Sequence, residues 1–304
     1  MHAGGRGVES PDSTLTRKVL LLETSHNARD SRFPFDLGAF DLDGTILRRD
    51  LTVTEATMGA LGALRERGMR LVVATGRRFE GACEHAARLG FEGEDPVICY
   101  GGSMVRQMNG ETLLHRTLPK DVSVEVLEWA AEKGLHARVF TDSKIVASPE
   151  TTAVFKHLRR SEELDTEIVE SPAAWLLNGG EDPTKLVIVD HPTGVPNWLK
   201  EAQRTFSGRL FVTRSLPHYV EVGGLQGTKS EALKFLCERW EIDPARTLAF
   251  GYADNDVDML SFAGLGVAVG GMTAEVRAAA DAVAPPVDED GVASFVRYLL
   301  EEAL

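Results

Sequence analysis

The chain has 304 residues, of which 43% are hydrophobic, and this is enough for two domains of ordinary size with a core in each. Its 46 acidic and 33 basic residues give a net charge of −13, a field that repels phosphate backbones, so nucleic acid is not an expected partner. The chain has no apolar run near the roughly 18 residues of a membrane helix, and its three cysteines show no metal-ligand spacing, so we expect a cytoplasmic protein with no membrane partner.

We expect residues 1–35 to form a flexible N-terminal extension. Most of this segment is polar, and its one apolar patch, residues 19–22, is too short for a secretory signal. A continuous apolar strand is predicted at residues 37–40. A helix follows it, with Thr54 as the N-cap and Gly68 just after the last turn.

Strands and helices alternate through much of the remaining chain. Further strands are predicted at residues 69–74, 97–99, 247–250 and 265–269. Further helices are predicted at residues 79–89, 228–240 and 255–262, and two more begin at residues 273 and 291. This alternation is typical of a Rossmann-like α/β core, in which a parallel sheet has helices on both faces and ligands bind beyond the carboxyl ends of the strands.

The pattern changes between residues 119 and 206. Helical patterns at residues 122–132 and 151–160 alternate there with strand-like runs at residues 136–140, 145–147, 167–169 and 185–190. We therefore predict an inserted α+β domain at residues 119–206, within a core formed by residues 36–118 and 207–304.

Two carboxylates stand where the strand at residues 37–40 ends. Because strand periodicity is two, Asp41 and Asp43 can point to the same side of the chain. Such a pair can share a divalent cation, and one member can attack phosphorus while the other moves protons. Gly44 permits a tight turn whose N–H groups can cradle phosphate oxygens. The alternative is a surface turn rich in Asp and Gly.

A second apolar strand ends in Thr75-Gly76-Arg77. The Thr75 hydroxyl can donate to a phosphoryl oxygen there, and Gly76 exposes the adjacent backbone N–H. An ordinary helix cap is the alternative for Thr75. Arg77 either binds substrate or solvates the loop.

Lys229 lies at the start of a predicted amphipathic helix. A helix N-terminus already carries partial positive charge, so a cation is unfavourable there unless an anion lies nearby. This position favours a role beside a bound phosphate or a carboxylate. A solvated surface lysine is the alternative.

Four ordered segments resemble the motifs of the haloacid dehalogenase superfamily of phosphohydrolases. In chain order they are Asp41-Leu42-Asp43-Gly44-Thr45, Ala74-Thr75-Gly76-Arg77, Gly227-Thr228-Lys229 and residues 251–260. The resemblance covers roughly residues 37–300, and the motif spacing is similar to that of the Cof-type branch. It implies that the insertion is a C2B-type cap, which closes over the catalytic mouth and selects the substrate.

The resemblance also implies a role for each motif residue. Asp41 would be the nucleophile that forms an aspartyl-phosphate, Asp43 the acid and base, and Lys229 the counter-charge. Phosphate or substrate would bind at Gly44, Thr75, Gly76, Arg77 and Asn255. Mg²⁺ would bind at Asp41, Asp43 and Asp256.

Two residues depart from the family pattern. Tyr252 stands where the family usually has an anionic metal ligand, and a neutral phenol is a poor partner for Mg²⁺. Tyr100 stands where the family often has Asn, and we expect its bulk to narrow or reshape the substrate pocket.

The sequence thus predicts a Mg²⁺-dependent phosphatase of a small phosphorylated metabolite. Two alternatives stay open: a phosphomutase, and a degenerate member that binds a phosphorylated ligand or a protein with little turnover.

Overall fold

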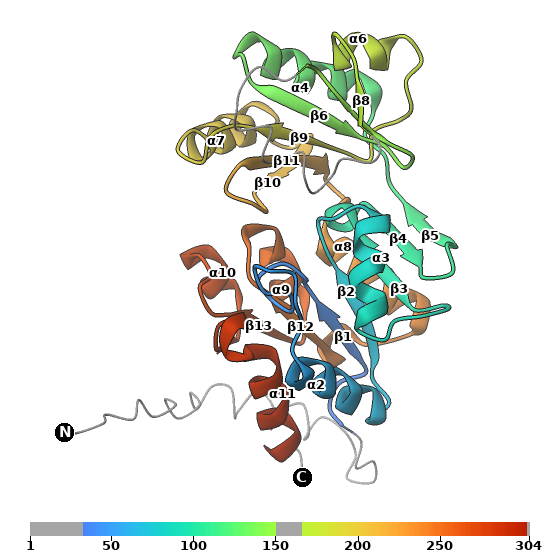
Figure 1. The fold of residues 1–304 in the computed structure, drawn as a ribbon, viewed down its shortest axis with the longest axis vertical. Helices are drawn as coiled ribbons and strands as arrows, with labels where there is room; N and C mark the ends of the chain where they lie inside the picture. The colour runs from blue at the N-terminus through green and yellow to red at the C-terminus, as the bar shows by residue number, and fades with distance from the viewer. Residues whose placement is uncertain (1–32, 150–165, 303–304) are drawn as a thin grey trace, which may run out of the picture.

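The computed structural model describes residues 33–149 and 166–302, which form two units stacked along the long axis of the molecule (Figure 1). Each unit is built on its own sheet, one of eight strands and one of six. The predicted α/β core with an inserted α+β domain is confirmed. The helix predicted at residues 151–160 and most of the predicted N-terminal extension lie outside the described residues.

The eight-stranded sheet forms the core. Its order is β14 (Ala282–Ala284), β13 (Leu265–Val269), β12 (Thr247–Gly251), β1 (Leu37–Phe40), β2 (Arg70–Ala74), β3 (Pro96–Cys99), β4 (Met104–Gln107) and β5 (Thr112–His115). The strands from β14 to β3 are parallel, whereas β4 and β5 continue the sheet as antiparallel strands. The predicted strands of the core all lie in the parallel part.

Helices cover both faces of the core sheet. On one face α2 (Glu55–Glu66), α3 (Phe79–Arg88) and α11 (Gly291–Glu302) pack against one cluster of buried side chains. On the other face α8 (Lys229–Trp240), α9 (Val257–Phe262) and α10 (Ala274–Ala279) pack against a second. Residues of β1 alternate between them: Phe40 belongs to the first cluster, and Leu37 and Ala39 belong to the second.

Hydroxyl caps begin three of these helices. Thr54 Oγ1 accepts from the Thr57 amide at 3.2 Å, and Thr228 Oγ1 accepts from the Glu231 amide at 3.4 Å. Thr273 caps α10 in the same way. Each cap satisfies one of the N–H groups that the first helical turn leaves unpaired, which explains why the starts of α2 and α8 could be predicted closely.

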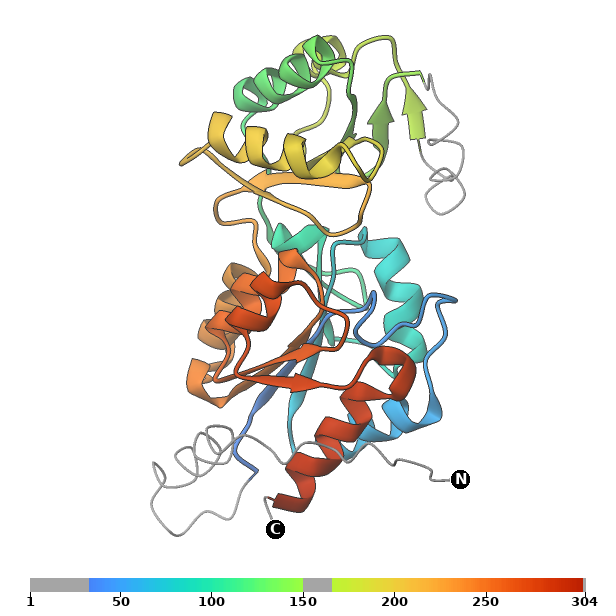
Figure 2. The ribbon, with the colours of Figure 1, turned by 90° about the vertical axis from the view of Figure 1, so that its left-hand side faces the viewer.

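The second unit has strand order β10 (Leu210–Thr213), β11 (Tyr219–Gly224), β9 (Lys185–Val189), β6 (His136–Phe140), β7 (Ile145–Ala147) and β8 (Thr166–Ile168). Helices α4 (Lys120–Glu132), α6 (Pro172–Leu177) and α7 (Val195–Thr205) pack on one face of this sheet. Figure 2 shows these helices on the side that faces away from the core. The opposite face contributes Phe140, Ile145 and Tyr219 to a cluster that includes core residues such as Tyr100.

Two predicted boundaries need correction. The core was expected to resume at residue 207, but β10 and β11 belong to the second sheet, where β11 pairs antiparallel with β9. The short runs of these strands resemble those of the core, so the pattern alone did not reveal their partner. We propose that the inserted domain spans residues 119–224. The predicted extension also ends earlier than residue 35, because Phe33 and Phe35 are buried in the core.

Within the part of the chain that the structure describes, each helix is too short or too polar to cross a membrane.

We expect Phe250→Ala to lower the free energy of unfolding by about 3–5 kcal/mol, because it leaves a cavity in the core. The Phe250 ring is fully buried, stacks on Phe40 with centroids 5.3 Å apart, and meets the Phe295 ring edge-on at 5.7 Å. Urea unfolding measures the change. Leu177→Ala, at a side chain that is 68% exposed, is the control and should shift the value by less than about 0.5 kcal/mol. Equal effects of the two substitutions would contradict this packing.

Candidate active site

The structure brings the motif residues together at the carboxyl edge of the core sheet. Asp41 follows β1, Thr75 follows β2 and Asp256 follows β12. Strand β1 lies between β2 and β12 in the sheet, so the three ends are adjacent. Lys229, the first residue of α8, reaches the same place from the far end of the sequence. The parallel topology therefore assembles groups that are up to about two hundred residues apart.

Lys229 joins two carboxylates in the centre of this site. Its Nζ lies 2.7 Å from Asp41 Oδ1 and 2.6 Å from Asp256 Oδ1. The side chains of Lys229 and Asp256 are fully buried, and Asp41 is 5% exposed. These carboxylates are the anions that the position of Lys229 at a helix N-terminus requires.

The remaining oxygens of both carboxylates also have donors. Asp256 Oδ2 accepts from the amides of Tyr252 and Ala253 at 2.8 and 2.9 Å. Asp41 Oδ2 accepts from the Thr45 hydroxyl at 3.0 Å. Each Asp41 oxygen thus accepts one of these hydrogen bonds and keeps a lone pair for reaction.

Burial dominates the electrostatics of Asp41. It raises the pKa of the Asp41 carboxyl to about 7, with the nearby Asp256 charge adding to the rise and Lys229 opposing it. Burial by itself lowers the pKa of Lys229, but the charges of Asp256 and Asp41 more than compensate and hold that pKa above its ordinary value. Lys229 therefore stays an ammonium ion between the two carboxyl groups.

Arg77 holds the second carboxylate of motif I. Its Nε and Nη2 donate to the two oxygens of Asp43 at 2.9 and 2.6 Å, a bidentate pair that fixes the orientation of the carboxylate. The Asp43 side chain is 39% exposed, far more than that of Asp41. Asp43 therefore faces the open side of the site, where a leaving group or a water molecule can reach it.

The motif II turn supplies polar groups beside this pair. Thr75 is fully buried, and its Oγ1 accepts from the Arg77 amide at 3.2 Å. A Cβ built on Gly76 would lie 3.6 Å from both Asn255 Nδ2 and Glu221 Oε1, so Gly76 lies between motif IV and strand β11 of the inserted domain. A side chain at this position would intrude between the two units.

The Tyr252 ring contacts the backbone at two glycines. A Cβ on Gly44, whose φ is +80°, would come within 2.6 Å of Tyr252 Cδ1, and a Cβ on Gly271 would come within 3.3 Å of Tyr252 Cε2. The ring thus packs between two glycines, one of them in the motif I turn. The glycines leave space for the phenol that a carboxylate would not need.

Asp254, the nearest carboxylate to Tyr252 in the chain, has other partners. Arg214, in the loop between β10 and β11, contacts Asp254 Oδ2 at 3.0 Å through Nε and at 2.8 Å through Nη2. The Thr273 hydroxyl donates to the other Asp254 oxygen at 2.7 Å. Asp254 therefore connects motif IV to the inserted domain, and each of its oxygens already has a partner.

Tyr100 connects the two units as well. It is 2% exposed, has φ of +53°, and donates its hydroxyl hydrogen to the Thr141 carbonyl in the inserted domain at 3.2 Å. Burial raises the pKa of the Tyr100 phenol, so it stays a donor. Its hydroxyl thus joins the core to the inserted domain.

Sequence reasoning missed Lys185 and Arg214, which come from the inserted domain and contact the catalytic loops. Both lie in a segment that carries none of the four motifs, and a single charged residue beside a short strand has no distinctive pattern. Glu221, in β11, is a further contact of Lys185. Its ion pair with Lys185, at 3.3 Å, could not be predicted from the sequence.

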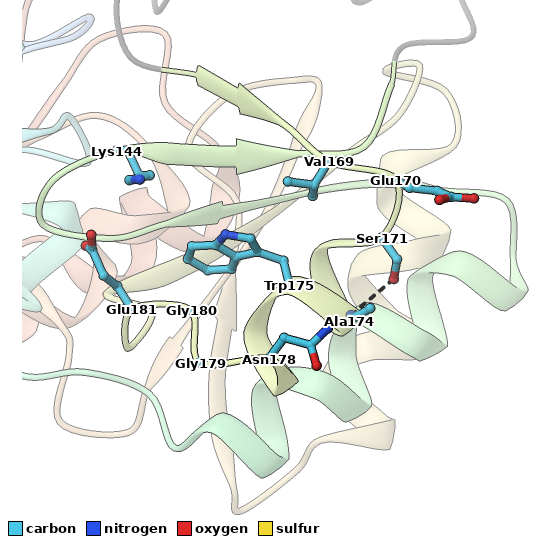
Figure 3. Close-up of a pocket in the computed structure, with 10 residues that line it drawn as sticks. All are labelled: Lys144, Val169, Glu170, Ser171, Ala174, Trp175, Asn178, Gly179, Gly180 and Glu181. Carbon is cyan, nitrogen blue, oxygen red and sulfur yellow. Dashed lines mark hydrogen bonds between the residues drawn. The ribbon is translucent and has the colours of Figure 1, made fainter.

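A separate pocket of about 520 Å³ lies wholly on the inserted domain (Figure 3). The indole of Trp175 points into it, and Lys144 and Glu181 lie at one end. The other residues that line it are Val169, Glu170, Ser171, Ala174, Asn178, Gly179 and Gly180. The motif residues do not take part in this pocket, which therefore differs from the candidate active site.

Comparisons with known proteins agree with this geometry. A family model for haloacid dehalogenase-like hydrolases matches residues 39–296. The 5-amino-6-(5-phospho-D-ribitylamino)uracil phosphatase YitU of Bacillus subtilis is 27% identical over 268 residues, which cover 85% of this chain and 95% of that protein. The HMP-PP phosphatase of Serratia proteamaculans is 30% identical over 253 residues, which cover 80% and 86%.

A solved structure shows the same architecture. The haloacid dehalogenase-like hydrolase from B. subtilis superposes with a TM-score of 0.76 at 25% identity, over 87% of this chain and 100% of that chain. A capped α/β fold with this site defines a phosphate-ester hydrolase. The chain belongs to the haloacid dehalogenase-like hydrolase family, and it is a phosphatase.

We expect Lys229→Met to lower the free energy of unfolding by about 3–5 kcal/mol, because it leaves two buried carboxyl groups without their cation. Arg88→Met is the matched control. It breaks an ion pair with Glu84 whose side chains are 57% and 64% exposed, and it should cost less than about 0.5 kcal/mol. Urea unfolding of both variants measures the difference. An unchanged stability of Lys229→Met would contradict a buried bridge between Asp41 and Asp256.

Proposed function

We propose that this phosphatase hydrolyses a small phosphorylated metabolite, with Asp41 as the nucleophile. The observation that carries the proposal is the buried position of Asp41 at the end of β1, where Lys229 and Thr45 orient both of its oxygens. The named relatives support the substrate class, since one is named for a phosphorylated ribitylaminouracil and another for HMP-PP.

In the first step a carboxylate oxygen of Asp41 attacks phosphorus, and the bond from phosphorus to the ester oxygen breaks. The leaving oxygen takes a proton from Asp43. In the second step Asp43 takes a proton from water as that water attacks the aspartyl-phosphate, and the bond from phosphorus to Asp41 breaks. Inorganic phosphate is released, and the Asp41 carboxylate and the protonated Asp43 are restored.

Arg77 would orient Asp43 in this sequence. Each Asp43 oxygen accepts one hydrogen bond from Arg77 in the structure and keeps a lone pair through which Asp43 can exchange a proton. A phosphoryl group can compete for the same guanidinium, because guanidinium binds phosphate as readily as carboxylate. Substrate binding would thus bring the phosphate and Asp43 together beside Arg77.

The other motif groups would surround the phosphoryl oxygens. We assign this role to the Thr75 hydroxyl, the Asn255 amide and the backbone N–H groups at Gly44 and Gly76. Thr75 and Asn255 are buried, so their dipoles are fixed before substrate arrives. Closure of the inserted domain would exclude water from these charges and strengthen their interactions.

The residues present fit a Mg²⁺ ion, although they supply little excess negative charge for it. When all three are ionised, the carboxylates of Asp41, Asp43 and Asp256 face two cations, Lys229 and Arg77, which leaves one excess negative charge. Within the described residues no group of three His, Cys, Asp or Glu side chains could hold a metal by itself. Mg²⁺ commonly binds through one or two carboxylates plus substrate phosphate and water, so a site completed by substrate suits this set.

We therefore propose that Asp41 and Asp256 hold Mg²⁺ together with the substrate phosphate. Asp43 would join them through the lone pairs that Arg77 leaves free. A bound Mg²⁺ would supply charge stabilisation for the phosphoryl oxygens. Lys229 supplies part of the same stabilisation from the protein itself.

Replacing each motif I carboxylate should separate the two proposed steps. With p-nitrophenyl phosphate, Asp41→Asn should lose turnover by at least about 10²–10⁴-fold and give no burst, because an amide does not attack phosphorus. Asp43→Asn should release close to one equivalent of p-nitrophenol and then stall, because this leaving group needs no proton whereas the attacking water needs a base. Stopped-flow absorbance measures both traces.

Asp50→Asn is the control, since Asp50 is exposed and bonds only to Thr52 among the contacts described. It should keep the rate of the unchanged protein. A burst in Asp41→Asn, or steady turnover by that variant, would rule out Asp41 as the nucleophile.

Tyr252→Asp should tighten Mg²⁺ binding by about tenfold, which corresponds to about 1.4 kcal/mol from one added anionic ligand. The measurements are calorimetric titration of Mg²⁺ in the presence of inorganic phosphate and the Mg²⁺ dependence of p-nitrophenyl phosphate hydrolysis. Tyr252→Phe keeps the ring between Gly44 and Gly271 and should behave like the unchanged protein. If the unchanged protein already saturates at low Mg²⁺ and Tyr252→Asp weakens binding, the proposed lack of a metal ligand is wrong.

A further inference from the structure

Lys185 belongs to the inserted domain, where it begins β9, but its ammonium group contacts the core. Lys185 Nζ donates to the carbonyl oxygen of Gly76, in motif II, at 2.8 Å. The lysine side chain is only 6% exposed. A buried cation from one unit thus binds the backbone of a catalytic loop in the other.

The other partners of Lys185 are protein groups as well. Besides the hydrogen bond to Gly76, Nζ lies 3.3 Å from Glu221 Oε2, and it lies 5.1 Å from the centroid of the Phe140 ring. The nearby Ser215 hydroxyl donates to the other Glu221 oxygen. Lys185 is therefore held in place by protein groups, and its contact with motif II is made through the Gly76 carbonyl.

The peptide unit between Gly76 and Arg77 is held at both ends. A trans peptide directs its carbonyl oxygen and its N–H in opposite directions. The oxygen accepts from Lys185, and the N–H of Arg77 donates to Thr75 Oγ1 at 3.2 Å. Because Thr75 Oγ1 accepts this hydrogen bond from the Arg77 amide, the hydroxyl hydrogen of Thr75 is left to donate to another group. The N–H of this peptide unit belongs to Arg77, whose guanidinium binds Asp43.

We propose that Lys185 is a positioning residue that couples docking of the inserted domain to the geometry of motif II. When the domain docks, Lys185 fixes the peptide plane after Gly76, and that plane orients the Thr75 hydroxyl toward the phosphoryl group. The domain therefore completes the phosphate site in addition to covering it. This inference rests on the proposed function, in which Thr75 binds the phosphoryl group.

Other contacts between the units provide a matched control. Arg106 Nη2, in β4, lies 2.8 Å from Asp142 Oδ2, in the loop after β6. This ion pair also crosses from core to inserted domain, but it does not involve the motif II peptide. Asp142→Asn therefore removes an interdomain charge pair, one in which the Asp142 side chain is 41% exposed, and leaves the Gly76 contact intact.

The test compares Lys185→Met, Thr75→Val, their combination, and Asp142→Asn by kcat and KM for p-nitrophenyl phosphate. We expect Lys185→Met to lower kcat/KM by about tenfold to a hundredfold, the effect of misplacing a group by a fraction of an ångström to one ångström. The combination should be no slower than Thr75→Val alone, because both changes remove the same contribution. Asp142→Asn should stay within about twofold of the unchanged protein and should be additive with Thr75→Val.

Folding is checked with a second variant, because Lys185→Met leaves Glu221 buried without its cation. Lys185→Met/Glu221→Gln removes both charges and should fold, with the same loss of kcat/KM and the same non-additivity with Thr75→Val. Unchanged activity of either folded variant, or additive effects with Thr75→Val, would overturn the proposal. Failure of both variants to fold would show instead that Lys185 is a folding determinant, and would also overturn it.

The controls separate this inference from the proposed function. If Asp41→Asn is inactive and Thr75→Val is impaired while Lys185→Met is fully active, only the role of Lys185 is wrong. If Asp41→Asn or Thr75→Val retains full activity, the proposed function itself is wrong.

Discussion

The buried bridge from Lys229 to Asp41 and Asp256 is the interaction on which the rest of the site depends. Its two short contacts bring the first, third and fourth motifs to one point, although those motifs lie on β1, α8 and the loop after β12. Burying three ionisable groups is costly unless they are paired, and the pairing must be geometrically good to offset the loss of water. The surrounding core therefore has to hold β1, α8 and β12 in a fixed relation.

The fold meets that requirement with aromatic and aliphatic packing directly behind the site. Phe40, the residue before Asp41, stacks on Phe250, which lies in the neighbouring strand β12. Both rings are fully buried. The strand that leads to Asp41 and the strand that leads to Asp256 are thus joined by a paired backbone register and by their side chains. Rigidity of this kind preorganises the charges, which is the main contribution a protein makes to phosphoryl transfer.

The sequence predicted the core well because its elements have strong local signals. Thr54 and Thr228 cap helices, and the run at residues 37–40 reads as a buried strand. The order of the motifs also allowed the catalytic groups to be placed on one edge of the sheet. Contacts between distant segments could not be predicted in the same way. Strand β11 pairs with β9, and Lys185 binds a backbone carbonyl more than a hundred residues earlier. Neither contact depends on a residue pattern that is local in the chain.

Arg214 and Lys185 bear on how such proteins can evolve. Both residues are encoded within the insertion, yet they contact Asp254 in motif IV and Gly76 in motif II. The insertion is therefore not an independent module that could be exchanged between related enzymes without consequence. A chimaera with a foreign insertion would leave Asp254 without its guanidinium and the motif II carbonyl without its ammonium. Divergence toward new substrates in this lineage would then require matched changes on both sides of the boundary.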